Sequence, residues 1–320
     1  MAIATPARAT RAFVLLNPVA GTCTADDVRR ALERHFTVGA TSCEIHETCR
    51  DDCLEELARE ARERGFDMVI AAGGDGTVSA VANGLVGSAT PLGIIPLGTT
   101  NVLARELGIP VDLEGACQLL AGAHGLRSVD AMRVGDQNYF TQVGVGIDAL
   151  MIRDTGREAK RRFGRIAYLW TAFTRLLGFQ PRKFFLAVDG RKRHFRASQV
   201  LVANGGILGQ PPFRWGPGIR PDDGRLDVCI VRARTLLDYL RLAWHVLTGQ
   251  HKKSPNVKYL ASHRDILIDT EHPLPVQADG EIIGETPVRV VAAPGAIQVV
   301  VPVTISRPFS GLPLVGSPSR

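Results

Sequence analysis

The stretch Met68-Val69-Ile70-Ala71-Ala72-Gly73-Gly74-Asp75-Gly76-Thr77 decides the fold of the N-terminal half of this chain. Its apolar beginning predicts a strand that is buried on both faces of a sheet. The glycine-rich pentapeptide predicts a tight turn, and residues 78–85 a helix. Glycines let backbone N–H groups approach phosphate oxygens, and the helix adds its positive end. The stretch therefore predicts a strand, a phosphate-binding loop and a helix.

Similar strand and loop units flank this one. A strand over residues 12–16 leads into Asn17-Pro18-Val19-Ala20-Gly21, and a strand over residues 92–96 leads into Leu97-Gly98-Thr99-Thr100-Asn101. Further elements are expected as helices at 25–35, 51–64 and 102–107 and a strand at 43–46. This alternation predicts an α/β domain with a largely parallel sheet over residues 1–130. Ligands bind at the carboxyl ends of such strands, so the loops at Asn17, Gly73 and Gly98 should converge on one nucleotide-binding crevice.

The sequence changes character near residue 130. Short strands, expected at 184–188, 199–203 and 226–230, are separated by Gly, Pro and Asp turns, with helical insertions at 160–177 and 236–247. These features predict a second, mainly β domain over residues 131–307. The tail at 308–320 is rich in Pro, Gly and Ser, and we expect it to be disordered.

Bulk properties narrow the classes of partner. The 320 residues carry a net charge of +6 and a pI near 9.2, which favours an anionic partner. Basic and aromatic residues do not interleave as in nucleic-acid-binding modules, so nucleic acid is excluded. No apolar run approaches the roughly 18 to 20 residues that span a bilayer. The six cysteines show no pairing framework and the N-terminus has no signal peptide, so we expect a cytoplasmic protein.

The pentapeptide alone leaves several roles open. Asp75 could act through a metal or order the phosphate loop, and Thr77 could donate its hydroxyl or cap the helix. A tight turn that needs glycines for steric reasons is the structural alternative. The Walker pattern Gly-x-x-x-x-Gly-Lys-Ser/Thr is absent, which argues against a P-loop ATPase.

Taken in order, the motifs resemble the diacylglycerol kinase catalytic-domain family, which includes bacterial diacylglycerol kinases and sphingosine kinases. The resemblance extends over residues 11–303. Its motifs are the three loops already described and Gly144-Val145-Gly146-Ile147-Asp148-Ala149, Asn204-Gly205-Gly206, Pro221-Asp222-Asp223-Gly224-Arg225-Leu226-Asp227-Val228 and Asp279-Gly280-Glu281. The pentapeptide alone also resembles NAD kinases and phosphofructokinases, so the order of the motifs makes the resemblance specific.

The resemblance implies an N-terminal α/β domain that holds ATP and a C-terminal β-sandwich that helps to form a lipid site. The residues that it implies for nucleotide binding are Asn17, Gly21, Thr48, Gly73, Gly74, Asp75, Gly76, Thr77, Ser79, Thr99 and Thr100. Ser79 stands where an asparagine is common in the family.

Kinase chemistry needs a group that accepts the proton of the attacking hydroxyl. The resemblance places this catalytic acid in Gln277-Ala278-Asp279-Gly280-Glu281, where the glycine allows a turn that presents acidic side chains. Asp279 is the first choice for the base and Glu281 the second. A hairpin turn with two exposed acids is the structural alternative.

Magnesium is expected at two places. Asp222-Asp223-Gly224 offers hard oxygen ligands, and the resemblance implies a structural Mg²⁺ held by Asp223 with backbone carbonyls near Arg220 and Arg225. A plain turn is the alternative. A separate Mg²⁺ should arrive with ATP and bridge its phosphates near Asp75.

Two segments suggest contact with a membrane. Residues 160–179 are basic and amphipathic, and the helix at 236–247 contains Trp244 and precedes Lys252-Lys253. Such segments can lie on an anionic membrane surface, or they can cover the β domain with solvated arginines. The expected partners are thus a lipid substrate and, peripherally, the inner membrane face, while a homodimer is left open.

The leading hypothesis is an ATP-dependent kinase that transfers the γ-phosphoryl group to a hydroxyl of diacylglycerol or a related lipid, with a sphingoid base as another candidate. One alternative is an NAD kinase, which should not carry both the loop at Asn17 and the loop at Pro96–Asn101. The other is a nucleotide- and membrane-binding regulatory protein without catalysis.

Overall fold

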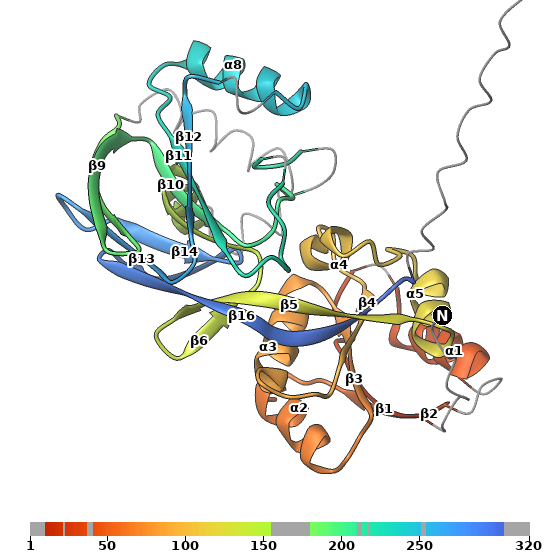
Figure 1. Cartoon of the computed structure of the whole chain (residues 1–320). Coiled ribbons are helices and arrows are strands. Elements are labelled where there is room, and N and C mark those ends of the chain that lie inside the picture. The colour runs from red at the N-terminus through yellow and green to blue at the C-terminus, as the bar shows by residue number, and fades with distance from the viewer. Residues whose placement is uncertain are drawn as a thin grey trace, which may run out of the picture.

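The computed structural model describes residues 10–21, 23–36, 41–154, 180–209, 213–216, 218–250 and 254–303 (Figure 1). The basic segment at 160–179, the pair Lys252-Lys253 and the tail at 308–320 lie outside the described residues, so the expectations for them stay predictions.

The N-terminal part is an α/β unit, as predicted. Its elements are β1 (Thr10–Leu16), α1 (Ala25–Phe36), β2 (Thr41–Glu47), α2 (Leu54–Glu63), β3 (Met68–Gly73), α3 (Asp75–Leu85), β4 (Leu92–Pro96), α4 (Val102–Glu106) and α5 (Leu113–Ala121). The strands pair in parallel in the order β2-β1-β3-β4. Strands β3 and β4 are buried along their whole length, which explains their continuous apolar runs.

Helices cover both faces of this sheet. Apolar residues of α1 and α5, including Leu32 and Leu120, pack on one face. Residues of α2 and α3, including Ala58 and Val81, pack on the other. A parallel sheet needs this double cover because both of its faces are apolar. The three βα loops consequently open at one edge of the sheet, beyond the carboxyl ends of β1, β3 and β4.

The C-terminal part is an antiparallel β-sandwich, also as predicted. Its elements are β5 (Gly125–Val134), β6 (Gln137–Tyr139), β7 (Gln142–Gly146), α6 (Ile147–Asp154), β8 (Arg182–Val188), β9 (Arg191–Ala197), β10 (Gln199–Ala203), β11 (Leu226–Val231), α8 (Leu236–Leu247), β12 (Val257–Ser262), β13 (Asp265–Thr270), β14 (Pro275–Ala278), β15 (Glu281–Glu285) and β16 (Val288–Val301). One layer has the strand order β12-β11-β10-β7-β14-β15. Its inner residues pack on β8, β13 and β16 of the other layer.

Two long strands join the two parts (Figure 1). Strand β16 pairs with β13 near Val290, with β5 along most of its length, and in parallel with β4 at Val299. One ten-stranded sheet therefore runs through the molecule from β2 to β9. The expected division at residue 130 falls inside β5, and that division stays a prediction.

Several boundaries differ from those expected. Helix α3 begins at Asp75 rather than at Val78, so most of the glycine pentapeptide belongs to the first turn of the helix. Helix α2 begins at Leu54 rather than at Asp51. The helix α5, which was not predicted, begins after Asp112, whose side chain accepts a hydrogen bond from the Gly115 N–H as an N-cap.

Candidate active site

The three glycine-containing loops converge on one crevice, as predicted. The Asn17 side chain at the end of β1 donates from Nδ2 to Thr77 Oγ1 in α3 (3.1 Å). The backbones of Gly74 and Gly98 lie so close that a Cβ built on Gly98 would be 2.7 Å from the Gly74 Cα. Gly21 has a φ of +71°, and a Cβ there would lie 1.8 Å from the Leu97 carbonyl oxygen. The glycines are thus required for close packing between the loops.

Helix α3 directs its N-terminus into this crevice. Gly74 is the N-cap and has no side chain that could satisfy the first-turn N–H groups. These N–H groups have no acceptor within the helix, and the helix dipole adds partial positive charge. The end of α3 is therefore suited to bind a phosphate group.

Asp75 holds the neighbouring loop in place. Its carboxylate accepts hydrogen bonds from the Thr100 hydroxyl (2.6 Å), the Asn101 N–H (3.0 Å) and the Val102 N–H (2.6 Å). Both oxygens are thereby engaged at the start of α4. Of the two roles considered from the sequence, this geometry supports the ordering of the loop.

A cleft of about 710 Å³ lies in front of these loops. Such a volume lies within the usual range for ligand sites, about 300–1,000 Å³. The predicted nucleotide-binding residues that line it are Asn17, Gly21, Gly74, Gly76, Thr77 and Ser79. Asp279 and Glu281 line its far side from the C-terminal domain. The cleft is therefore built by both domains.

The other predicted nucleotide-binding residues do not line this cleft. Gly73 is buried, and a Cβ there would meet the Thr77 side chain at 2.5 Å. The Thr48 N–H bonds the Leu16 carbonyl oxygen (2.8 Å) at the sheet edge. Asp75 and Thr100 line a second cavity, and Thr99 lines neither space.

This second cavity adjoins the cleft and has a volume of about 260 Å³. Ser79 and Asp279 line both spaces. Six apolar residues from five parts of the chain line the rest of this cavity, together with the polar residues Asp75, Thr100, Thr141 and Gln142. The apolar residues are Val78, Val102, Leu103, Phe140, Ile152 and Ile207. An acyl or other apolar group fits this lining better than a charged one.

Asp279 occupies the turn of a β-hairpin between β14 and β15. Both turn residues have positive φ, +45° at Asp279 and +92° at Gly280, as an Asp-Gly hairpin turn requires. The hairpin that was considered as the structural alternative is therefore present, yet its two acids differ. Glu281 is exposed, whereas Asp279 is partly buried, lines both cavities and turns its carboxylate toward residues 140–142.

The Asp279 carboxylate is anchored by the segment that connects β6 and β7. Oδ1 accepts from the Thr141 N–H (3.0 Å), the Thr141 hydroxyl and the Gln142 N–H (3.0 Å). Oδ2 accepts from the Phe140 N–H (2.9 Å). Among the described residues, Oδ2 thus has fewer donors than Oδ1, and it can accept a further proton or hydrogen bond.

Burial is the largest influence on this group and raises the pKa of Asp279 above its ordinary value. The hydrogen bonds from Thr141, Gln142 and Phe140 act in the opposite direction, because they stabilise the charged form. A carboxylate with a raised pKa is a stronger proton acceptor than an exposed one, and perturbed groups of this kind are concentrated in active sites.

Asp148 supports the Asp279 turn through the Gln277 side chain. Its Oδ2 accepts from Gln277 Nε2 (2.9 Å), and Gln277 Oε1 in turn accepts from the Gly280 N–H (3.2 Å). Burial raises the pKa of Asp148 to about 6. Asp148 belongs to the Gly144–Ala149 motif of the family resemblance, and in the structure its side chain helps to position the Asp279 turn.

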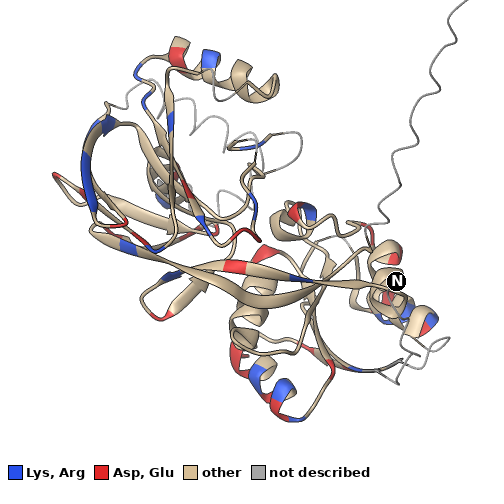
Figure 2. Ribbon diagram, viewed as in Figure 1, with Lys and Arg blue, Asp and Glu red and all other residues tan. Residues whose placement is uncertain are grey.

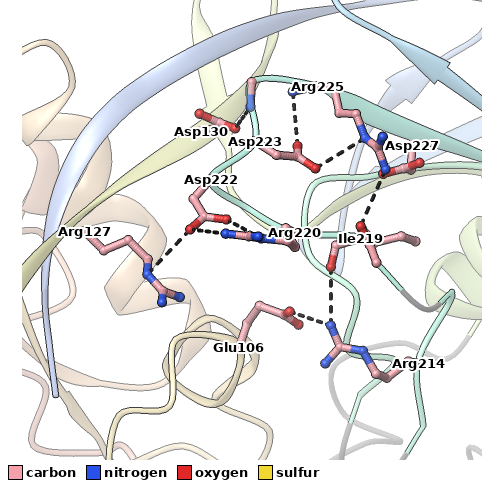
Figure 3. A network of polar contacts seen from close by, with 12 residues as sticks. Glu106, Arg127, Asp130, Arg214, Ile219, Arg220, Asp222, Asp223, Arg225 and Asp227 are labelled. Atoms are coloured by element: carbon pink, nitrogen blue, oxygen red, sulfur yellow. Dashed lines mark hydrogen bonds and ion pairs between the residues drawn. The ribbon is translucent and has the colours of Figure 1, made fainter. Parts of the chain in front are cut away.

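The segment with the predicted structural magnesium site forms a network of ion pairs (Figure 3). Arg220 binds Asp222 through two nitrogens (3.0 and 3.1 Å), and Arg225 Nε lies 3.3 Å from Asp223 Oδ2. Among the described residues, no group of three or more His, Cys, Asp or Glu side chains could hold a metal ion. The predicted site would combine the Asp223 carboxylate with backbone carbonyl oxygens rather than with other acidic side chains, so it stays a prediction.

Two contacts near the cleft were not found from the sequence. Asn83 of α3 bonds β6, with Nδ2 donating to the Asn138 carbonyl oxygen (2.9 Å) and Oδ1 accepting from the Asn138 N–H (3.0 Å). Glu106 at the end of α4 accepts from the Ile207 N–H (2.8 Å) and from Arg214 Nη2 (2.7 Å). Both tie the N-terminal domain to the C-terminal one, and no local pattern marks either pair.

Two family models match the chain and divide it between them. The model "Diacylglycerol kinase catalytic domain" matches residues 11–134, and "YegS C-terminal NAD kinase beta sandwich-like domain" matches residues 141–301. Together they include most of the residues that line the cleft, from Asn17 to Glu281, whereas Gln137, Asn138 and Tyr139 lie between the two matched ranges.

Related proteins cover most of the chain. The diacylglycerol kinase of Bacillus subtilis (strain 168) is 29% identical over 297 residues, which are 91% of this chain and 96% of that protein. A protein of Chromohalobacter salexigens named "Probable lipid kinase YegS-like" is 31% identical over 250 residues, 77% of this chain and 79% of that protein.

The fold also matches a solved structure. The crystal structure of a diacylglycerol kinase from Bacillus anthracis str. Sterne superposes with a TM-score of 0.74 at 23% identity, covering 93% of this chain and 98% of the other. The motif order, the two-domain architecture and these relatives agree, so this chain belongs to the diacylglycerol kinase catalytic-domain family and is a lipid kinase.

Proposed function

We propose that this protein transfers the γ-phosphoryl group of ATP to the hydroxyl of a membrane lipid, with diacylglycerol as the leading acceptor. The single observation that carries the proposal is the position of Asp279. This residue lines both the large cleft in front of the glycine loops and the smaller cavity. A base in this position can reach an acceptor hydroxyl while a nucleotide occupies the other space.

The nucleotide would bind in the larger cleft. The first turn of α3 offers N–H groups and partial positive charge to its phosphates, and Gly74, Gly76 and Gly98 leave space for close approach. ATP would bring Mg²⁺ with it, which offsets charge on the transferring phosphoryl group.

The acceptor would bind in the smaller cavity. Asp279 Oδ2 would take the proton of the acceptor hydroxyl as its oxygen attacks the γ-phosphorus. The bond between the γ-phosphorus and the bridging oxygen then breaks, and ADP leaves with the electron pair. The apolar walls from α4 and Ile207 suit a glycerol backbone with acyl chains better than a nicotinamide nucleotide. They therefore favour a lipid acceptor over NAD.

Product analysis with labelled ATP tests this proposal. The purified protein, ATP labelled in the γ position and Mg²⁺ would be incubated in parallel with diacylglycerol, a sphingoid base and NAD, and the products separated by thin-layer chromatography. We expect label in a phosphorylated lipid and none in NADP. Label in NADP, or ATP binding without any labelled product, would contradict the proposal and would favour the NAD kinase or the non-catalytic protein.

A further inference from the structure

Helix α8 carries an unusual share of the exposed apolar surface. Of the twelve large hydrophobic residues that are exposed in the described structure, four lie on this helix. They are Leu237, Leu240, Trp244 and Leu247, with exposed fractions of 53%, 58%, 67% and 55%. Their spacing of three and four residues places them on one side of the helix. We call this side the α8 stripe.

The helix is firmly built despite this exposure. Thr235 and Asp238 form a capping box at its start, and Asp238 also accepts from Asn256 Nδ2 (3.3 Å). Asp238 is the only acidic residue of α8, and these contacts engage it. The α8 stripe is therefore presented by a helix with fixed ends and has no carboxylate of its own.

A strongly basic strand lies at the same end of the molecule. Strand β9 reads Arg-Lys-Arg-His-Phe-Arg-Ala and forms the edge of the ten-stranded sheet. Arg191, Lys192, Arg193 and Arg196 are exposed, and among the described residues none of the four pairs with a carboxylate. Figure 2 shows this blue edge of the sandwich, away from the N-terminal domain.

The start of β9 also lines a cavity suited to an anion. Arg191, Arg193 and Arg264 line a space of about 460 Å³ together with Asp189. The Asp189 carboxylate accepts from the Ser262 hydroxyl (2.7 Å) and from the His263 and Arg264 N–H groups, so it is largely satisfied. Three guanidinium groups therefore leave an excess of positive charge, which fits a phosphate group.

Strand β12 connects the α8 stripe to the basic strand. Asn256, which contacts Asp238 of α8, directly precedes β12. Lys258 of β12 then places its ammonium 5.2 Å above the ring of Phe195 in β9. The apolar and the basic surfaces thus belong to one end of the sandwich (Figure 1).

We infer that this end of the sandwich docks on an anionic lipid bilayer, with the α8 stripe inserted among the lipids and β9 bound to their phosphate groups. The inference rests on the proposed function, because a lipid kinase must meet its substrate at a membrane. The charge decides between a bilayer and a second copy of this chain. Two copies packed here would bring their unpaired cations together, whereas an anionic surface attracts each of them.

Co-sedimentation with vesicles tests the docking surface. The full chain would be mixed with vesicles of equimolar phosphatidylglycerol and phosphatidylcholine, and with vesicles of phosphatidylcholine alone. We expect binding to the anionic vesicles that weakens at high salt. The double variant Leu240→Ser/Trp244→Ser should bind about tenfold or more weakly, because it loses buried apolar area. Arg191→Glu/Arg193→Glu should lose a similar factor, and its residual binding should depend less on salt.

Matched controls separate docking from a general loss of apolar surface. Leu126 is 55% exposed, as is Leu247 of α8, but it lies at the start of β5, directly after the helices of the N-terminal part. Leu126→Ser should bind vesicles like the unchanged protein, and Leu247→Ser should bind more weakly. Brominated acyl chains should quench tryptophan fluorescence in the unchanged protein, and Trp244→Phe should lose that quenching. Thermal unfolding would check that each variant is folded.

Three outcomes would overturn the inference. They are equal vesicle binding by the α8 variants and the unchanged protein, no binding by the unchanged protein, or a dimer that Leu240→Ser/Trp244→Ser dissociates while vesicle binding is unaltered.

A short-chain diacylglycerol dispersed in water distinguishes failure of membrane docking from failure of the proposed kinase function. The α8 variants should phosphorylate it at the unchanged rate, whereas failure of the proposed function would appear as no phosphorylation by any protein.

Discussion

Asp279 combines features that are hard to read from its neighbours in the sequence. An Asp-Gly pair before a strand predicts a hairpin turn, and the hairpin is present. Which way the carboxylate points is decided by residues 140–142, whose N–H groups bind it from a distant part of the chain. The residue could therefore be named from the sequence, but its environment could not.

The Thr141 hydroxyl is expected to tune this carboxylate. It stabilises the charged form, so Thr141→Val should raise the pKa of Asp279 beyond its already raised value. A base must be deprotonated to act, so the rate of phosphoryl transfer should rise with pH through that pKa. The acidic limb of the kcat profile should consequently move to higher pH in Thr141→Val.

The conservative variant Thr141→Ser keeps a hydroxyl and should restore the profile of the unchanged protein. The measurement is kcat against pH at saturating ATP and lipid for the three proteins. An acidic limb that stays at the same pH in Thr141→Val would show that this carboxylate does not control the rate.

For Asp75, too, the sequence could name the residue but not the partners of its side chain. Its place between two glycines allowed either a metal ligand or a residue that orders the loop. The bonds to Thr100, Asn101 and Val102 support the second role, because they engage both carboxylate oxygens. These partners lie in a loop that the sequence brings near Asp75 only through the order of the sheet strands.

At the level of elements, the βα units were predicted well because their strands are buried on both faces. Continuous apolar runs fix β3 and β4, and glycines follow them where loops must approach one another. Pairing between distant segments gives no such local signal. The contact of Val299 with Leu92, which joins β16 to β4, was therefore missed.

The loop at Gly21 offers a test of close packing. Gly21 and Gly65 have nearly the same φ, +71° and +74°, but a Cβ on Gly21 would overlap the Leu97 carbonyl oxygen and one on Gly65 would meet nothing within 4 Å. Gly65→Ala should cost roughly 1–2 kcal/mol of unfolding free energy for the left-handed backbone alone. Gly21→Ala should cost more and should also weaken binding of an ATP analogue.

Denaturant unfolding and calorimetric titration of both variants would give these two quantities. Equal losses of stability, with unchanged nucleotide affinity in Gly21→Ala, would show that the contact with Leu97 does not shape the cleft.

At the scale of the whole molecule, β16 takes part in both hydrophobic cores. Val288 and Val290 pack in the sandwich, whereas Ile297 and Val299 pack with the helices α2 and α3. The composition change near residue 130 indicated two domains, but it could not show that the last strand, β16, returns to the sheet of the N-terminal domain. The two domains should therefore unfold together.

Ile297→Ala tests this coupling. Ile297 is 1% exposed, and removing a buried isoleucine side chain costs about 2–5 kcal/mol. Tryptophan fluorescence reports on the C-terminal half, which contains all three tryptophans, whereas far-UV circular dichroism also includes helices α1 to α5 of the N-terminal part. Both midpoints in denaturant should fall together.

Val303→Ala, at a 55% exposed position just after β16, is the control and should change neither midpoint. If Ile297→Ala lowered the circular dichroism midpoint and left the tryptophan midpoint in place, the two domains would be independent.

The central claim is that Asp279, at the junction of the two cavities, takes the proton of a lipid hydroxyl while ATP gives up its γ-phosphoryl group. The most direct test is the rate of label transfer from γ-labelled ATP to diacylglycerol by the unchanged protein, Asp279→Asn and Glu281→Gln. We predict a loss of at least about 10²-fold in kcat for Asp279→Asn, with ATP affinity and thermal stability retained, and little loss for Glu281→Gln. Transfer by Asp279→Asn at the unchanged rate would contradict the claim.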